Sequence, residues 1–459
     1  MDALRTAIPY ALAVYFIYRG TRSRIFLLGI PFLMYIRSAV FFEKAHPFWM
    51  PGRFSADFHV FSWLVLVWIL CTGLLLPRSA GGPRSRPFGP RLSYPEEGTI
   101  VLLGVLALLE LVVTTLRHGD PEVAVGEGLG FFYLLAGYFL VRGIVSSVSL
   151  EHVLEFVRVL VIVNTGAAVL FILHQGLHLR VYTGAEFMTT VVAGQTITRT
   201  YYFMPQLVLL SIAYIFARRS WTAWTVAAAV INLGAVWISY TRSLLAIAAV
   251  IIALSLVVRF MKLSTAGAAV RRTMTVGVLL VALFVGATSF FPVQSQFFLG
   301  RLSEVATASS VSDVRNINYR EWKFRVTYEG VAARDPVLGA GFVSAAQDSM
   351  VATVDRFQSD IVWVPVLFRL GVTGIGLFGL AFILYGWRAA RLAAHHSGDV
   401  ELFSIVWLCL LAGLFLEGFV SWSFMQPGRM AMGLWAFAFL GGVVGVARSQ
   451  THRATLSRP

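Results

Sequence analysis

Apolar segments long enough to cross a lipid bilayer recur along most of the chain. A membrane-spanning helix needs about 20 apolar residues, and by that measure the sequence predicts about 12 to 13 spans. The predicted spans are 5–18, 24–42, 58–76, 98–117, 123–141, 151–174, 202–217, 221–238, 241–259, 273–290, 361–388, 402–424 and 428–447. Because a helix satisfies its backbone polar groups within one segment, these lengths predict an all-α, polytopic bundle of transmembrane helices.

Composition supports the membrane class and narrows the range of functions. The chain is 58% hydrophobic and 13% charged, with a mean hydropathy of +0.75, whereas soluble domains carry about 25% charged residues. The basic residues behind the formal net charge of +14 lie largely in short loops between apolar runs. That distribution is typical of topology determinants, so nucleic acid is not expected as a partner.

The cysteines and the N-terminal segment exclude two further classes. The two cysteines, Cys71 and Cys409, lie inside apolar runs. No disulfide framework and no Cys-x-x-Cys metal site is therefore expected. The first apolar run ends in Arg19 instead of a small-residue cleavage site, so we expect no cleavable signal peptide.

Loop charge predicts the orientation of the spans. Basic residues gather in alternate loops and in the C-terminal tail, and the positive-inside rule places these parts of the chain in the cytoplasm. They are Arg19, Arg22, Arg24, Arg78, Arg84, Arg86, Arg91, Arg142, Arg218, Arg219, Lys262, Arg271, Arg272, Arg388, Arg391, Arg448, Arg453 and Arg458. The remaining loops are then outside: 43–57, 118–122, 175–201, 239–242, 291–360 and 425–427.

The outer loop at 291–360 is the longest interruption of the apolar sequence, and it carries the densest cluster of ionisable side chains. It divides the chain into N-terminal transmembrane helices (1–290), a large outer loop (291–360), and C-terminal transmembrane helices with a cytoplasmic tail (361–459). Such a loop leaves the membrane and returns to it. We therefore expect it to form a platform against the outer surface of the bilayer.

One segment of this loop has the pattern of an amphipathic helix. Ser312 or Asp313 is placed to cap a helix that runs to about Val331, since both residue types are preferred at N-caps. Tyr319, Trp322 and Val326 share one face of it at helical spacing. A helix of this kind often lies in the membrane interface. The stretch 335–341, with its Pro and paired Gly, predicts a turn that ends the helix.

Three features on the predicted outer side have residue types suited to binding phosphate or moving protons. Arg199 stands where a loop re-enters the bilayer, and Arg242 stands at the outer end of a span. The loop at 291–360 contributes Arg301, Arg315 and Arg320 and ends in Asp360, directly before an apolar run.

Each feature also has a simpler structural interpretation. Arg199 can serve as an interfacial anchor, Arg242 as a snorkelling residue, and Asp360 as a helix N-cap. The remaining basic residues considered in the loop are expected to form a solvated surface: Lys323, Arg325, Arg334 and Arg356.

Ionisable residues also occur inside predicted spans. They are Arg37, Glu110, Glu127, Arg158, Arg369 and Glu417. Burial in lipid is costly, so each is a functional candidate by default. Glu127 and Glu417 could line a sugar or lipid groove, or pair with Arg37 or Arg369 for structure; we favour pairing.

The order of these motifs resembles that of the O-antigen ligase and polymerase superfamily of bacterial envelope glycosyltransferases. The family has an Arg and then Pro-Asn at a span start, here Arg199 and Pro205-Gln206, followed by Ser-x-x-Arg, here Ser239 to Arg242. Its long periplasmic loop carries an Arg, a Trp and Pro-x-x-Gly-x-Gly. These correspond to Arg315, Trp322, Pro336, Gly339 and Gly341.

The family's loop closes with His-Asn, and Gly-x-x-Gly follows at a fixed distance. Counting back from Gly371 and Gly374 places Asp360 at the His position and Ile361 at the Asn position. The resemblance covers approximately residues 190–380, and the His and both Asn positions depart from the family's pattern.

The resemblance implies a GT-C-like enzyme that transfers a glycan from undecaprenyl diphosphate to an acceptor hydroxyl, without a metal or other cofactor. Arginines can hold a departing diphosphate bidentately and stabilise its developing charge, which suits Arg199, Arg242, Arg315 and Arg320. The acceptor hydroxyl needs a general base. Asp360 is the candidate, with Asp355 and Asp348 as alternatives.

The function expected first is polymerisation of lipid-linked repeat units at the periplasmic face of the bacterial inner membrane. The alternative is a ligase that moves the glycan to lipid A-core. A transporter or flippase is a third interpretation, and it predicts inverted repeats and broken helices that meet at mid-bilayer. The expected partners are the lipid-linked glycan, an acceptor glycan, the bilayer and a chain-length regulator protein.

Overall fold

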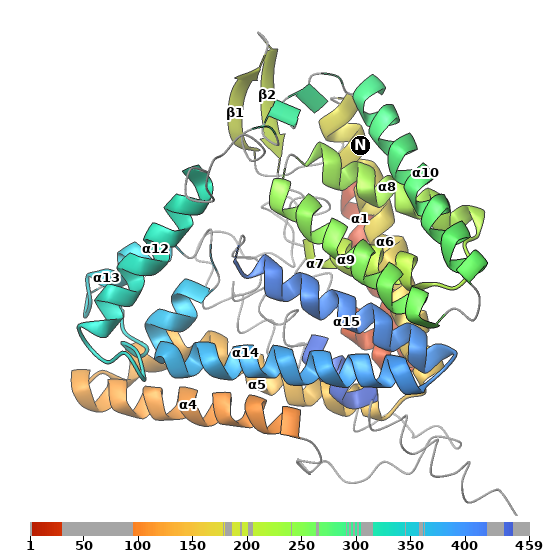
Figure 1. The fold of residues 1–459 in the computed structure, drawn as a ribbon. Coiled ribbons are helices and arrows are strands. Elements are labelled where there is room, and N and C mark those ends of the chain that lie inside the picture. The colour runs from red at the N-terminus through yellow and green to blue at the C-terminus, as the bar shows by residue number, and fades with distance from the viewer. Residues whose placement is uncertain are drawn as a thin grey trace, which may run out of the picture. The chain divides into compact units, whose positions relative to one another are not determined.

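The computed structural model describes only part of the 459-residue chain. The described residues are 2–29, 95–177, 179, 186–192, 195–200, 205–239, 241–262, 266–290, 292, 295–296, 299–300, 303, 315–344, 346–357, 361, 363–419 and 436–443. Most of these residues lie in helices (Figure 1).

Most of the described helices overlap predicted apolar spans, and two, Arg315–Ala332 and Met350–Phe357, lie in the predicted outer loop. Their bounds are α1 Asp2–Arg22, η1 Arg24–Leu28, α4 Pro95–His118, α5 Pro121–Ser146, α6 Leu150–Leu177, α7 Pro205–Ala217, α8 Ala223–Ile238, α9 Arg242–Lys262, α10 Ala266–Phe290, α12 Arg315–Ala332, α13 Met350–Phe357, α14 Trp363–His395 and α15 Asp399–Glu417. Within the described residues, α4, α6, α9, α14 and α15 are long and apolar enough to cross a membrane. The expectation of a helical chain with several segments long and apolar enough to cross a membrane is confirmed. The predicted spans 58–76 and most of 24–42 and 428–447 lie outside the described residues.

A β-hairpin lies in the loop predicted at 175–201. Strand β1 (Glu186–Val192) pairs antiparallel with β2 (Gln195–Thr200), and the register shifts between Glu186 and Met188. The strands are rich in β-branched residues, which favour extended backbone. This hairpin was not predicted from the sequence.

The chain divides into two compact units built from separate stretches of sequence. Unit 1 contains Met1–Phe58, Leu150–Thr307 and Ala390–Gly413, and unit 2 contains His59–Ser149, Ala308–Ala389 and Leu414–Pro459. In unit 1, α6 packs against α7 and α8, α7 packs against α9, and α10 packs against α8 (Figure 1). In unit 2, α4 packs against α5 and α12 packs against α13.

Buried amides and hydroxyls join three helices of unit 1. Asn164 on α6 donates from Nδ2 to Ser211 Oγ on α7 at 3.0 Å and to Asn232 Oδ1 on α8 at 2.7 Å. Asn232 donates in turn to Thr165 Oγ1 at 3.0 Å. Side-chain hydrogen bonds between helices in an apolar setting fix the register of the helices against one another.

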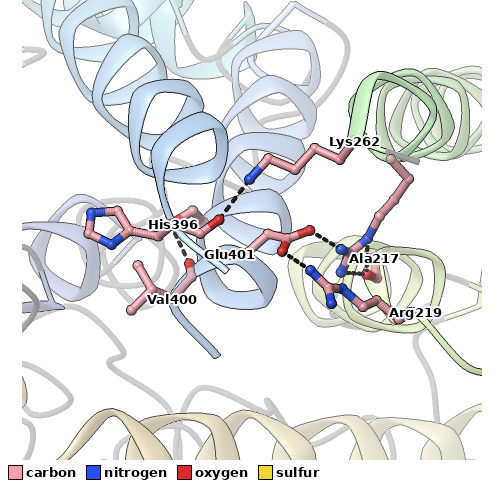
Figure 2. A network of polar contacts seen from close by, with 8 residues as sticks. Ala217, Arg219, Lys262, His396, Val400 and Glu401 are labelled. Carbon is pink, nitrogen blue, oxygen red and sulfur yellow. Dashed lines mark hydrogen bonds and ion pairs between the residues drawn. The ribbon is translucent and has the colours of Figure 1, made fainter. Parts of the chain in front are cut away.

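A buried carboxylate ties the ends of several elements of unit 1 together (Figure 2). Glu401 near the start of α15 accepts hydrogen bonds from Arg219 and Arg259. Arg259 also donates from Nε to the carbonyl of Ala217, the last residue of α7, at 2.6 Å. Lys262 Nζ donates to the carbonyl of His396 at 2.7 Å (Figure 2). Arg219 and Arg259 thus pair with Glu401. Arg259 and Lys262 satisfy main-chain carbonyls at helix ends, which lack intrahelical partners.

Polar side chains of unit 2 are also paired between helices. Arg142 on α5 donates to Glu97, and Arg388 on α14 donates to Glu96, both in the first turn of α4. Carboxylates in a first turn also interact favourably with the helix dipole. The buried hydroxyls of Tyr138 and Tyr385 are hydrogen-bonded to each other.

We predict that Glu401→Gln destabilises the protein strongly, because Arg259 then keeps a buried charge without a carboxylate. Breaking a buried ion pair from one side costs about 3–5 kcal/mol. Arg219→Gln should cost at most about 1 kcal/mol, since the Arg219 side chain is 65% exposed and exposed pairs contribute little. Thermal unfolding of the purified protein in detergent measures both. The control is Glu151→Gln, an exposed carboxylate on α6, and equal melting temperatures for Glu401→Gln and Glu151→Gln would contradict the prediction.

Candidate functional site

A tight turn follows α12, as the sequence predicts from its Pro and Gly residues. The helix ends at Ala332, close to the predicted end at Val331. Asp335 Oδ1 then accepts hydrogen bonds from the backbone N–H groups of Val337 and Leu338, each at 3.0 Å. Aspartate side chains commonly stabilise turns in this way. Gly339 and Gly341 have positive φ angles of 91° and 79°. We call residues 336–342 the outer turn.

Helix α14 is broken at Gly371, where φ is 60° and ψ is −163°. The outer turn supplies the main-chain partners at this break. Ala340 N donates to the carbonyl of Phe368 at 2.7 Å, Val372 N to that of Pro336 at 3.0 Å, and Thr373 N to that of Val337 at 3.2 Å. Backbone in an apolar environment is tolerated outside a regular helix only when other groups satisfy it. The turn and α14 therefore form one hydrogen-bonded structure.

Neither glycine at this contact can carry a side chain. A Cβ on Gly339 would lie 2.6 Å from Gly371 N, and a Cβ on Gly371 would lie 2.3 Å from the carbonyl oxygen of Val337. Both distances are far below van der Waals contact, and both residues have a backbone conformation that L side chains rarely adopt. The Pro-x-x-Gly-x-Gly motif and the Gly-x-x-Gly motif therefore meet in one backbone contact.

The other side of the outer turn lies on α4. Phe342 N donates to Thr114 Oγ1 at 3.0 Å. A Cβ on Gly341 would lie 2.1 Å from Thr114 Oγ1 and 3.2 Å from Glu110 Oε2. Glu110 is 1% exposed, and its Oε1 has no hydrogen-bond partner among the described residues. Glu110 and Thr114 are one helical turn apart, so both reach the same side of α4.

Charged side chains near the outer turn form ion pairs. Arg117 Nη2 lies 4.0 Å from Asp335 Oδ2. Arg369 on α14 donates to Glu127 on α5, to the carboxylate at 2.6 Å and to the carbonyl at 2.9 Å. The structural pairing of Glu127 with Arg369 that the sequence favoured is therefore confirmed. The guanidinium of Arg369 also lies 5.9 Å from the ring centroid of Phe342, a distance typical of a cation–π contact.

One expectation about the loop surface is wrong. Lys323 is 3% exposed instead of solvated, and its Nζ lies 4.3 Å from the ring centroid of Tyr319. The two residues are four positions apart on α12, where side chains meet, and a lysine stem packs readily on apolar surface. Arg325 and Arg334 are exposed, as expected, and Arg334 pairs with Asp348 at 2.8 Å.

The structure places the main chain of most predicted site residues but not their side chains. Arg199 lies in β2 opposite Met188, Arg242 begins α9, and Arg315 begins α12; the side-chain positions of these three lie outside the described part. Arg320 is half-buried on α12. Asp360 and Arg301 lie outside the described residues, as do the side chains of Asp355 and Arg356. Convergence of the arginines on Asp360 remains a prediction.

Two residues at the outer turn were not assigned to a site from the sequence. Glu110 was noted only as an ionisable residue within a span, and Thr114 was not noted. Polar residues four positions apart in an apolar helix lie on the same face. This spacing is the sequence pattern that could have indicated that Glu110 and Thr114 belong to one site. Within the described residues there is no group of three or more His, Cys, Asp or Glu that could hold a metal ion.

The described helices make this chain a helical protein with several segments able to cross a membrane. No model of a known protein family matches the chain, and a search of curated proteins finds no match to it. The case for a function therefore rests on the motifs and on the geometry around the outer turn.

We predict that Gly371→Ala and Gly339→Ala each destabilise the protein. A positive-φ residue other than Gly costs about 1–3 kcal/mol, and the backbone clash adds a further, similar cost. The melting temperature of each purified variant checks this. Gly376→Ala is the matched control, because it lies in the same helix and a Cβ there meets nothing within 4 Å. The explanation fails if Gly371→Ala is as stable as Gly376→Ala.

Proposed function

We propose that the chain is a multi-pass membrane glycosyltransferase that polymerises undecaprenyl-diphosphate-linked oligosaccharide units at the periplasmic face of a bacterial inner membrane. The observation that carries the proposal is the main-chain contact between the outer turn and Gly371. This contact joins the Pro-x-x-Gly-x-Gly motif to the Gly-x-x-Gly motif, which the resemblance to the glycosyltransferase superfamily had matched separately.

The same contact connects the elements that carry candidate catalytic residues. Helix α12 contains Arg315 and Arg320 and leads into the outer turn, which is bonded to α14. Asp360 stands three residues before α14 in the sequence. A rigid connection of this kind suits a reaction that requires the donor and the base to be held in fixed geometry.

In the proposed reaction the acceptor hydroxyl oxygen forms a bond to the anomeric carbon of the donor sugar. The bond from that carbon to the diphosphate oxygen breaks, and undecaprenyl diphosphate leaves with the electron pair. Asp360 takes the hydroxyl proton as general base. Arg199, Arg242, Arg315 and Arg320 stabilise the charge on the departing diphosphate. No cofactor is part of this proposal.

Two other functions are less well supported. A ligase of the same superfamily would use lipid A-core as acceptor, and an assay that offers lipid A-core against a second repeat unit separates the two. A transporter would be expected to break its helices at mid-bilayer. In α14 the break at Gly371 is closed by main-chain hydrogen bonds from the outer turn, so these backbone groups are not available to bind a transported ion or solute.

We predict that Asp360→Asn lowers polymer synthesis by about 10²- to 10⁴-fold, the usual contribution of a general base. Arg315→Gln and Arg320→Gln should lower it by about 10²-fold, as expected for the loss of one charge-stabilising donor. The assay follows conversion of lipid-linked repeat units to polymer in membranes with matched protein levels. Arg325→Gln, an exposed residue of α12, is the control and should retain full activity. Wild-type synthesis by Asp360→Asn would remove Asp360 from the mechanism.

A further inference from the structure

Glu110 is a buried carboxylate that the proposed reaction does not use. Of the four other buried glutamates of the described residues, Glu96, Glu97 and Glu401 each accept a hydrogen bond from an arginine. Glu110 instead keeps one carboxylate oxygen, Oε1, without a hydrogen-bond partner among the described residues. The fourth, Glu417, has an Oε2 without a hydrogen-bond partner in the same part of the chain, but it is the last residue of α15, whereas Glu110 lies beside the outer turn. A buried acceptor left without a donor is costly, and within a membrane span such a group is a functional candidate.

The neighbours of Glu110 indicate what kind of group it can bind. Thr114 Oγ1 accepts from Phe342 N, and a threonine hydroxyl also has one proton to donate. The Thr114 hydroxyl and the Glu110 carboxylate both lie close to the position that a Cβ would take on Gly341, so the two groups line the same space. A sugar hydroxyl both donates and accepts, so it complements a carboxylate acceptor beside a hydroxyl donor.

Charge around Glu110 favours a neutral ligand over an anion. Arg117, an arginine near the outer turn, lies 4.0 Å from Asp335 as an ion pair. An anionic ligand beside the Glu110 carboxylate would have to compete with Asp335 for this cation. A hydroxyl-bearing sugar avoids this competition.

The outer turn is held unequally at its two sides. Three main-chain hydrogen bonds join it to α14, whereas one hydrogen bond, from Phe342 N to Thr114, joins it to α4. Because Glu110 is 1% exposed, binding of a ligand at its carboxylate requires Gly341 to move away from α4.

We propose that Glu110, together with Thr114, binds a hydroxyl group of the glycan and thereby selects the sugar part of the lipid-linked substrate. The inference rests on the proposed glycosyltransferase function and adds a site on α4 to it. Glu110 recognises the glycan, whereas the arginines recognise the diphosphate.

Ligand-induced thermal stabilisation of the purified full-length protein in nanodiscs tests this. The two probes are undecaprenyl diphosphate and the undecaprenyl-diphosphate-linked oligosaccharide extracted from the cells that make this chain. Glu110→Gln should bind undecaprenyl diphosphate as the wild type does and bind the lipid-linked oligosaccharide about tenfold more weakly or worse, since a hydrogen bond to a charged group is lost. Glu122→Gln, an exposed carboxylate in the first turn of α5, is the matched control and should behave as wild type.

The outcomes distinguish the two proposals. If neither probe stabilises the wild type, the proposed function is wrong. If both probes stabilise it and Glu110→Gln binds the oligosaccharide normally, only the inference about Glu110 is wrong. If Glu110→Gln binds both probes more weakly by the same factor, Glu110 has a purely structural role and the inference about Glu110 is also wrong. Should Glu110→Gln not fold, Thr114→Val compared with Thr114→Ser gives the same test, and the selective loss should appear in Thr114→Val alone.

Discussion

The structure of unit 2 depends on one constraint: backbone groups that water cannot reach must find hydrogen-bond partners within the protein. An unsatisfied backbone group in hydrocarbon costs several kcal/mol, so a membrane helix can be interrupted only where another segment replaces the lost partners. At Gly371 the outer turn provides that replacement through three hydrogen bonds. The sequence requirements at the contact follow directly, because two backbones can approach so closely only if both residues are glycine.

The same constraint applies to side chains elsewhere in the described residues. Asn164 and Asn232 find partners on neighbouring helices, and Glu401 is matched by two arginines. These arrangements explain how an apolar protein tolerates polar atoms inside its units. Glu110 departs from this pattern, and it lies beside the outer turn that carries the Pro-x-x-Gly-x-Gly motif.

Sequence predicted what is local and missed what depends on distant partners. The spans on α4 and α14 follow from apolar length, and the end of α12 follows from Pro336 and its glycines. The hairpin β1–β2 was missed because strand pairing depends on context more than on propensity. The glycines at 339 and 371 were visible in the sequence, but their contact was not. The burial of Lys323 is an exception among the local features, because it was not predicted although Tyr319, which it contacts, is only four residues earlier. The positions of Asp360 and of the arginine side chains are still predictions from sequence alone.

The ion pair between Arg259 and Glu401 has a consequence for biosynthesis. The two residues are 142 positions apart, so a ribosome completes α9 long before it makes the carboxylate that neutralises Arg259. Until Glu401 has been made, Arg259 lacks the carboxylate that pairs with it in the folded protein. Unit 1 therefore cannot reach its final state from its earlier segments alone.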